Sequence, residues 1–246
     1  MTADITALRR IWQQAFGDTD EMLDAFFSNG FSENRCHYLT ENAVPVSALY
    51  WFDCTLDGYK LAYLYAVATV ESCRGRGLAR RLMEETHEIL KKRGYAGGIL
   101  VPGTTELFAY YERLGYRKAT QIREFSCKQG GNATFLQEID IKRYAQLRKQ
   151  YLPAGGVVQE GSALEFLQTY GKFYEGGDCL LAAGENKGVL IAYELLGNAQ
   201  AAPGILRTLG FAEGQFRAPG TGRNFAMFLP LTTDCPIPAY FGLSMD

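Results

Sequence analysis

The sequence is poor in histidine and contains no long apolar run. Only two of its 246 residues are histidine, His37 and His87, so a zinc site built on histidine or a Ser-His-Asp triad is poorly supplied. No apolar stretch approaches the roughly 20 residues that span a bilayer, and the first residues lack the apolar block of a signal peptide. We therefore expect a cytoplasmic protein without a metal centre and without a membrane partner.

Paired cysteines and a strong net charge are also missing. The six cysteines lie without metal-ligand spacing, and in a chain without an export signal we expect reduced thiols. Cys73 has no evident histidine base near it, so we do not expect it to be a nucleophile. The net charge of −2 and the pI near 5.8 argue against nucleic acid as a partner.

Arginine and glycine are instead concentrated in one short segment, between a predicted strand and a predicted helix. Residues 60–70 (KLAYLYAVATV) are apolar without a helical period, which indicates a buried strand, whereas residues 78–92 have the apolar period of an amphipathic helix. The first backbone N–H groups of a helix have no helical partner, and arginine suits phosphate. The segment Arg74–Gly77 therefore predicts an anion site, with a plain turn and solvated arginines as the alternative.

Two familiar phosphate-binding loops do not match this segment. A P-loop requires Gly-Lys-Ser/Thr at the start of the helix, and that tripeptide is absent here. A dinucleotide fingerprint requires a third glycine or alanine at the position that Arg80 occupies. The phosphate that this loop would bind therefore belongs to another class of ligand.

A second motif lies in the next predicted helix, residues 104–115, which is followed by a predicted strand. Its end reads Tyr-Tyr-Glu-Arg-Leu-Gly-Tyr over residues 110–116, and Gly115 is expected to stop the helix. Taken alone, Tyr111 in this run is best explained as a core aromatic residue.

The two motifs together resemble those of the GNAT superfamily of acyl-CoA transferases. The resemblance lies in Arg74-Gly75-Arg76-Gly77-Leu78-Ala79 and in the run that contains Tyr111. It implies an α/β (α+β) fold with a mixed central sheet flanked by helices, acetyl-CoA as co-substrate, no metal, and Tyr111 as the general acid. The cofactor-binding residues that it implies are Val67, Ala68, Thr69, Arg74, Gly75, Arg76, Gly77, Leu78, Ala79 and Arg80.

The sequence departs from the family pattern at two supporting positions. Thr104 stands where an asparagine is frequent, and Leu61 stands where some members carry a glutamate base. The general base is therefore left open, to a water chain or to a residue elsewhere. The acceptor is open as well, since the aromatic residues of 50–52 and 63–65 fit either the wall of a pocket or the core.

The second half of the chain repeats part of the pattern of the first. We expect a GNAT domain over 1–128, a linker, and a second, shortened and degenerate GNAT-like domain over 133–246. Two predicted helices, a hairpin around residues 186–188 and the run Leu206–Phe211 support this repeat, the last as an echo of Tyr111–Tyr116. No arginine–glycine loop opens a helix after residue 130, and the tail from Pro236 is expected to be a final strand.

The sequence thus predicts an N-acetyltransferase that moves an acetyl group from acetyl-CoA to a primary amine of a small molecule or peptide. The alternative is a non-catalytic acyl-CoA-binding or regulatory protein that has kept only the cofactor loop. The sequence does not decide whether the protein forms a homodimer.

Overall fold

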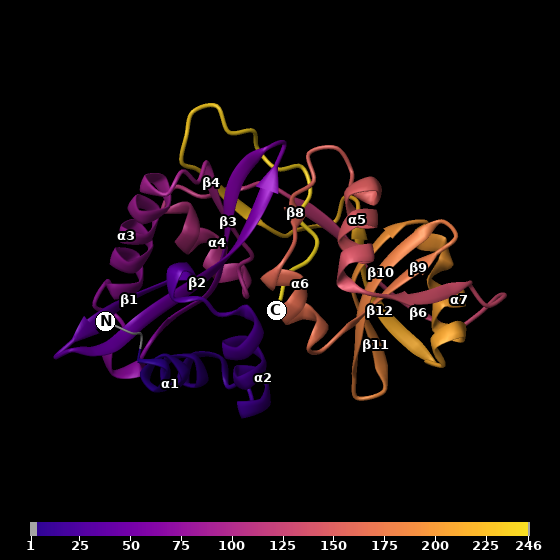
Figure 1. The fold of residues 1–246 in the computed structure, drawn as a ribbon, viewed down its shortest axis with the longest axis horizontal. Helices are drawn as coiled ribbons and strands as arrows, with labels where there is room; N and C mark the ends of the chain where they lie inside the picture. Colours follow the sequence, from indigo (N-terminus) through magenta and orange to yellow (C-terminus); the bar gives the residue numbers. More distant parts are fainter. Residues whose placement is uncertain (1–3, 246) are drawn as a thin grey trace. The chain divides into compact units, whose positions relative to one another are not determined.

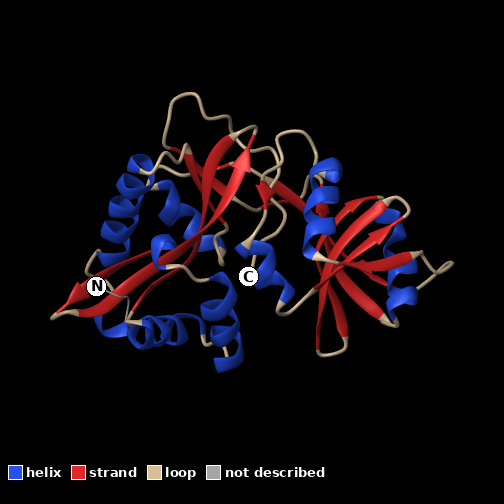
Figure 2. Ribbon diagram, in the orientation of Figure 1, coloured by secondary structure: helices blue, strands red, loops and turns tan. Residues whose placement is uncertain are grey.

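The computed structural model describes residues 4–245, which form two compact units. The first unit combines the chain up to Arg117 with Met227–Pro236, and the second combines Lys118–Ala226 with the chain from Ile237 onward. Figure 1 follows the chain through both units, and Figure 2 shows that each contains its own sheet with helices packed against it. None of the helices within residues 4–245 is long and apolar enough to cross a membrane.

The sheet of the first unit has the strand order β1-β2-β3-β4-β14-β5, in which β5 is the short edge strand Arg117–Lys118. Strands β1 to β3 form an antiparallel meander, β4 is parallel to β3, and β14 is antiparallel to β4. The elements of this unit are α1 (Ile5–Phe16), α2 (Asp20–Ala25), a π-helical turn (Phe26–Gly30), β1 (Cys36–Glu41), β2 (Val44–Leu56), β3 (Tyr59–Thr69), α3 (Leu78–Lys92), β4 (Gly97–Leu100), α4 (Thr105–Glu112) and β14 (Met227–Pro230).

Helices cover both faces of this sheet, and the pleat distributes the aromatic residues between the two faces. Trp12 of α1 packs against Tyr50 and Tyr65, with ring centroids 5.5 and 5.4 Å apart. On the other face, α3 and α4 pack on Trp51 and Leu64 in one apolar cluster. The aromatic segment of β2 is therefore divided between two cores, as the alternation of side chains along a strand requires.

Two strands are exchanged relative to our prediction. We expected the strand within 116–127 to belong to the first domain, but β6 (Gln121–Lys128) pairs with β12 (Glu213–Pro219) in the second sheet. Its place in the first sheet is taken by β14, which pairs with β4. The reason is burial: β4 is buried along its whole length, so its neighbour must be apolar, and Met227 and Phe228 of β14 are buried. The domain limits 1–128 and 133–246 remain predictions, and the compact units divide the chain differently.

The sheet of the second unit has the order β13-β6-β12-β11-β10-β9-β7. Helix α7 packs on one face with Leu206 and Phe216 in a common cluster, and Tyr144 of α5 stacks on Phe173 of β9. The remaining elements of this unit are β7 (Leu136–Ile139), α5 (Ile141–Tyr151), β8 (Val158–Gln159), α6 (Ser162–Gln168), β9 (Lys172–Gly176), β10 (Cys179–Asn186), β11 (Val189–Gly197), α7 (Ala202–Leu209) and β13 (Arg223–Asn224).

Helix α7 has a different topological position from the one that the sequence suggested. It connects β11 to the parallel strand β12, just as α3 connects β3 to the parallel strand β4. It is therefore the counterpart of α3, and our match of Leu206–Phe211 to Tyr111–Tyr116 is wrong. A short helix that ends in Leu-Gly-aromatic buries the same kind of residues in either position, so the pattern alone did not distinguish the two.

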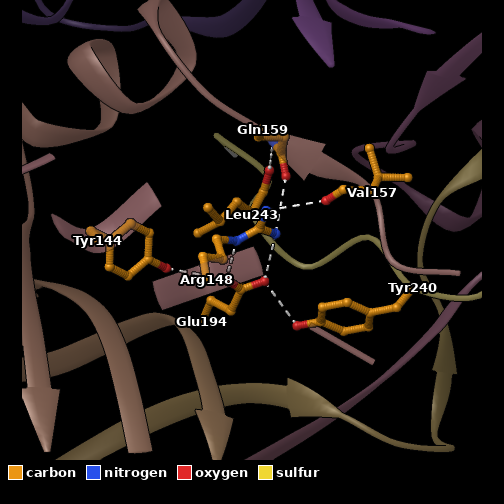
Figure 3. A network of polar contacts seen from close by, with 7 residues as sticks. All are labelled: Tyr144, Arg148, Val157, Gln159, Glu194, Tyr240 and Leu243. Atoms are coloured by element: carbon orange, nitrogen blue, oxygen red, sulfur yellow. Dashed lines mark hydrogen bonds and ion pairs between the residues drawn. The ribbon is translucent and has the colours of Figure 1, made fainter. Parts of the chain in front are cut away.

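A buried ion pair lies between α5 and β11 of the second unit (Figure 3). Arg148 donates from Nε and Nη2 to the two carboxylate oxygens of Glu194, at 2.7 and 3.0 Å, and these side chains are 1% and 0% exposed. Glu194 also accepts hydrogen bonds from the hydroxyls of Tyr144, at 3.1 Å, and Tyr240, at 3.0 Å. Burial alone would lower the pKa of Arg148, but the charge of Glu194 and its hydrogen bonds raise it, so the guanidinium stays charged.

The same network fixes the C-terminal segment. Tyr240 reaches Glu194 from this segment, and Gln159 Nε2 donates to the carbonyl of Leu243 at 2.7 Å. We predicted a final strand here, but within residues 237–245 the structure has only an isolated bridge of Tyr240 to Gly156. A few backbone hydrogen bonds to residues 155 and 157 and these side-chain hydrogen bonds, and not a strand ladder, therefore hold this end of the chain.

Candidate active site

The parallel strands β3 and β4 pair over a short distance and then part. Their ladder contains the pairs from Leu61↔Gly97 to Tyr63↔Ile99, whereas β3 continues to Thr69. Ala66 has a positive φ of 50°, and the register of β3 against β2 shifts around it, which indicates a bulge. The carboxyl ends of parallel strands are the usual ligand site of α/β sheets, and the predicted site residues lie at this edge.

The end of β3 is fixed by side chains around it. Ser47 of β2 donates from Oγ to the carbonyl of Ala68 at 3.0 Å, and its hydroxyl lies 2.8 Å from that of Thr69. Val67 packs partly buried against the α3-side core. The predicted residues Val67, Ala68 and Thr69 therefore form a rigid strand end beside the loop.

The loop before α3 has the backbone of an anion site. Gly75 and Gly77 have φ values of 74° and 76°, and a Cβ built on either would meet nothing within 4 Å. The first intrahelical bond runs from the N–H of Arg81 to the carbonyl of Gly77, and no side chain caps this end. The N–H groups of residues 78–80 (Leu78, Ala79 and Arg80) precede that bond, so these three donors have no partner within the helix at its positive end.

The arginines of this segment are paired within the protein. Arg76 makes a two-point contact with Glu41, and Arg80 pairs with Glu84 at 2.8 Å. Arg74 donates to backbone carbonyls, from Nε to Thr69 at 3.2 Å and from Nη2 to Gln14 at 3.3 Å. Exposed ion pairs of this kind contribute little to stability, so a phosphate can replace the carboxylates. Sequence reasoning missed Glu41, because it lies 35 residues before Arg76 and in no motif.

Tyr111 lies on α4 and is 8% exposed. Its ring packs at 71° to that of Tyr110 and at 66° to that of Tyr116, in the same cluster as Val67 and Leu78. The structure therefore brings the predicted acid into one apolar cluster with residues from the strand end and from the first turn of α3. Burial, and then the nearby Tyr110, raise the pKa of Tyr111, which keeps its hydroxyl protonated at neutral pH.

His87 is a buried residue of α3. It is 7% exposed, and its Nε2 lies 2.8 Å from the hydroxyl of Tyr116. Burial, followed by the charge of Lys91, lowers the pKa of His87 to about 4, so the ring is neutral at neutral pH. The contact with His87 holds the Tyr116 ring, which in turn packs against the ring of Tyr111.

Leu61 and Cys73 are both buried. Leu61, which stands where some family members carry a base, is fully buried. The Cys73 thiol is also buried and points at the Glu41 carboxylate, 3.8 Å away. Neither environment suits a base or a nucleophile in contact with substrate.

Surface hollows are present on the second unit, but they lack the features of the loop. One of about 420 Å³ lies over β6, β11 and β12, where Glu124 pairs with Arg217 at 3.2 Å. Its lining residues are Glu124, Phe125, Ser126, Ile191, Ala192, Gln215, Phe216 and Arg217. It has no helix N-terminus and no glycine loop, so we do not regard it as the active site.

The chain is similar to known acetyltransferases. A family model described as an acetyltransferase (GNAT) domain matches residues 1–119, whereas no curated protein matches the chain. Two solved GCN5-related N-acetyltransferases have a similar fold: that of Kribbella flavida (16% identity, TM-score 0.69, 94% of this chain and 71% of that one) and that of Anabaena variabilis (13%, 0.73, 93% and 71%).

A putative acetyltransferase from Pyrococcus horikoshii is similar over 98% of this chain and 90% of its own, at 14% identity and a TM-score of 0.65. At these identities the three structures establish likeness of fold alone. The family model covers β1 to β4, the glycine loop and α4, which are the elements that form the site. Residues 1–119, just under half of the chain, therefore match the acetyltransferase (GNAT) family model.

Proposed function

We propose that this protein is an acetyl-CoA-dependent N-acetyltransferase of the cytoplasm, acting on a primary amine of a small molecule or a peptide. The observation that carries the proposal is the open set of three N–H donors at residues 78–80, next to the parted strands β3 and β4. A pyrophosphate bound at these donors leaves its pantetheine arm to follow the end of β3. The thioester then lies on the side of the sheet where Tyr111 is buried.

The proposed reaction is a direct transfer. The amine nitrogen attacks the thioester carbonyl, the C–N bond forms, and the C–S bond breaks. A backbone N–H near Val67–Thr69 stabilises the oxyanion, and Tyr111 gives its proton to the departing thiolate. The proton of the attacking amine leaves through water, because position 61 carries a leucine.

We also propose that the second unit is a degenerate GNAT-like domain without a cofactor site. Its parallel pair β11/β12 around α7 supports the common topology. Its helix α7 follows a short 3-10 turn (Ala199–Ala201) and has a proline in its first turn, in place of a glycine loop with free N–H groups. One acetyl-CoA per chain follows from this assignment.

Calorimetry with CoA, together with a thiol-release assay on acetyl-CoA and a panel of amines, tests these proposals. We expect one CoA site per chain and amine-dependent release of the free thiol. Two sites per chain would show that the second unit binds the cofactor. Binding of CoA without thiol release, for every class of amine offered, would instead favour the non-catalytic acyl-CoA-binding protein.

Replacing Gly77 by valine is expected to weaken CoA binding tenfold or more, about 1.4 kcal/mol. The residue has a φ of 76°, which valine adopts only with strain, and the side chain would project into the open space where the phosphates bind. Gly94→Val is the matched control, since Gly94 has the same φ of 76° and open surroundings at the other end of α3. Equal losses of CoA affinity in both variants would indicate general destabilisation and not an anion site.

A further inference from the structure

The Glu41 carboxylate accepts hydrogen bonds from the guanidinium group of Arg76, the arginine between the two glycines of the loop. Arg76 Nη2 lies 2.6 Å from Oε1 of Glu41, and Nη1 lies 3.1 Å from Oε2. The Cys73 thiol donates to the same Oε2 at 3.8 Å. Glu41 is the last residue of β1, and the hairpin after it turns through Asn42 and Ala43, whose φ values are 50° and 63°. Glu41 of β1 thus acts as a counter-ion for Arg76 of the loop.

This contact has the geometry by which arginine binds a phosphate group. A guanidinium offers two parallel N–H donors, and these match two oxygens of a carboxylate or two oxygens of a phosphate. The side chains of Arg76 and Glu41 are 53% and 34% exposed, so water reaches the pair. An ion pair this exposed contributes little to stability, and an anion with more charge can therefore displace the carboxylate.

The loop does not depend on this ion pair for its position. Arg74 ties it to β3 and α1 through the carbonyls of Thr69 and Gln14. Cys73 and Arg74 close the preceding 3-10 turn with backbone bonds to Val70 and Glu71, at 3.0 and 3.2 Å. Removing the charge of Glu41 is therefore expected to change the electrostatics of the loop and not its fold.

We propose that Glu41 is an internal phosphate surrogate, which holds the Arg76 guanidinium until a phosphate of acyl-CoA displaces it. This inference rests on the proposed function. Each binding event then breaks the Arg76–Glu41 contact and places an anion near a released carboxylate. Glu41 thereby lowers the affinity for the phosphate-bearing part of the co-substrate and leaves the affinity for its thioester arm unchanged.

Calorimetry with CoA on the intact chain tests the proposal. Glu41→Gln is expected to tighten CoA binding threefold or more, and the gain is expected to fall below twofold when Arg76 is replaced by alanine in both proteins. Glu88→Gln is the matched control, because it removes the same charge from an exposed pair, with Lys91 at 2.8 Å, at the far end of α3. We expect this control to bind CoA with unchanged affinity.

S-acetylpantetheine, which lacks the nucleotide and its phosphates, is the second probe. Its KM as an acetyl donor is expected to be the same in the wild type and in Glu41→Gln. Unchanged or weaker CoA binding in Glu41→Gln, or equal tightening in Glu88→Gln, would overturn the proposal. A wild-type chain that binds no CoA would contradict the proposed function itself, so the two failures are distinguishable.

Discussion

Tyr111→Phe is expected to lower kcat about a hundredfold or more, equivalent to about 2.7 kcal/mol or more in the activation barrier. The phenyl ring fills the same place in the cluster of α3 and α4, so packing is preserved, but the proton for the leaving thiolate is lost. CoA affinity is expected to remain within about twofold of the wild type, since the phosphates bind at the loop. Steady-state kinetics with acetyl-CoA, together with CoA calorimetry, measure the two quantities separately.

The neighbouring tyrosine provides the control. Tyr110 lies on the same helix, and its hydroxyl is buried without a hydrogen-bond partner among the residues that the structure describes. Tyr110→Phe therefore removes the same atom one position away and is expected to retain nearly full turnover. Wild-type kcat in Tyr111→Phe, with a large loss in Tyr110→Phe, would transfer the role of the acid to Tyr110.

Glu194→Ala is expected to lower the free energy of unfolding by about 3–5 kcal/mol. The substitution leaves the Arg148 guanidinium charged and buried, and it removes the acceptor of the Tyr144 and Tyr240 hydroxyls. Urea denaturation followed by far-UV circular dichroism measures the loss. Both tryptophans, Trp12 and Trp51, lie in the first unit, so their fluorescence reports that unit alone.

An exposed pair in the same unit is the matched control. Arg143 of α5 contacts Glu175 of β9 through two hydrogen bonds of 3.0 and 2.6 Å, but these side chains are 46% and 29% exposed. Glu175→Ala is expected to cost far less stability than Glu194→Ala, because both partners of the exposed pair remain hydrated when the contact is lost. Replacing both buried partners, as Arg148→Met with Glu194→Leu, is expected to recover at least half of the loss, because no charge is then left unpaired. A Glu194→Ala loss no larger than that of Glu175→Ala would contradict the assigned cost of burial.

Local features of the first unit could be predicted from the sequence. The helix over 78–92 and the strand over 60–70 follow from periodicity, and the structure has α3 at Leu78–Lys92 and β3 at Tyr59–Thr69. The glycines at 75 and 77 indicated a special backbone, and both have positive φ. These features depend on neighbouring residues, which a sequence displays directly.

Long-range features could not be predicted in this way. Nothing local to Met227–Pro230 indicates that this strand pairs with β4, and nothing local to β6 indicates that it pairs with β12. The Arg76–Glu41 contact and the burial of His87 against Tyr116 likewise depend on segments that meet only in the folded chain. The resemblance to a family indicated the candidate site, whereas the contact of Glu41 with Arg76 is visible only in the folded chain.

The exchanged strand affects the synthesis of the protein. Because β14 (Met227–Pro230) pairs with β4, the first sheet lacks a strand until residues 227–230 have left the ribosome. Domains commonly fold N-terminal first during translation. Here we expect the first unit, which carries the glycine loop, to have an unpaired β4 edge until β14 is synthesised. A premature stop anywhere between Lys118 and Ala226 therefore removes a strand from the first unit as well, so translation of the second half is a condition for completing the first.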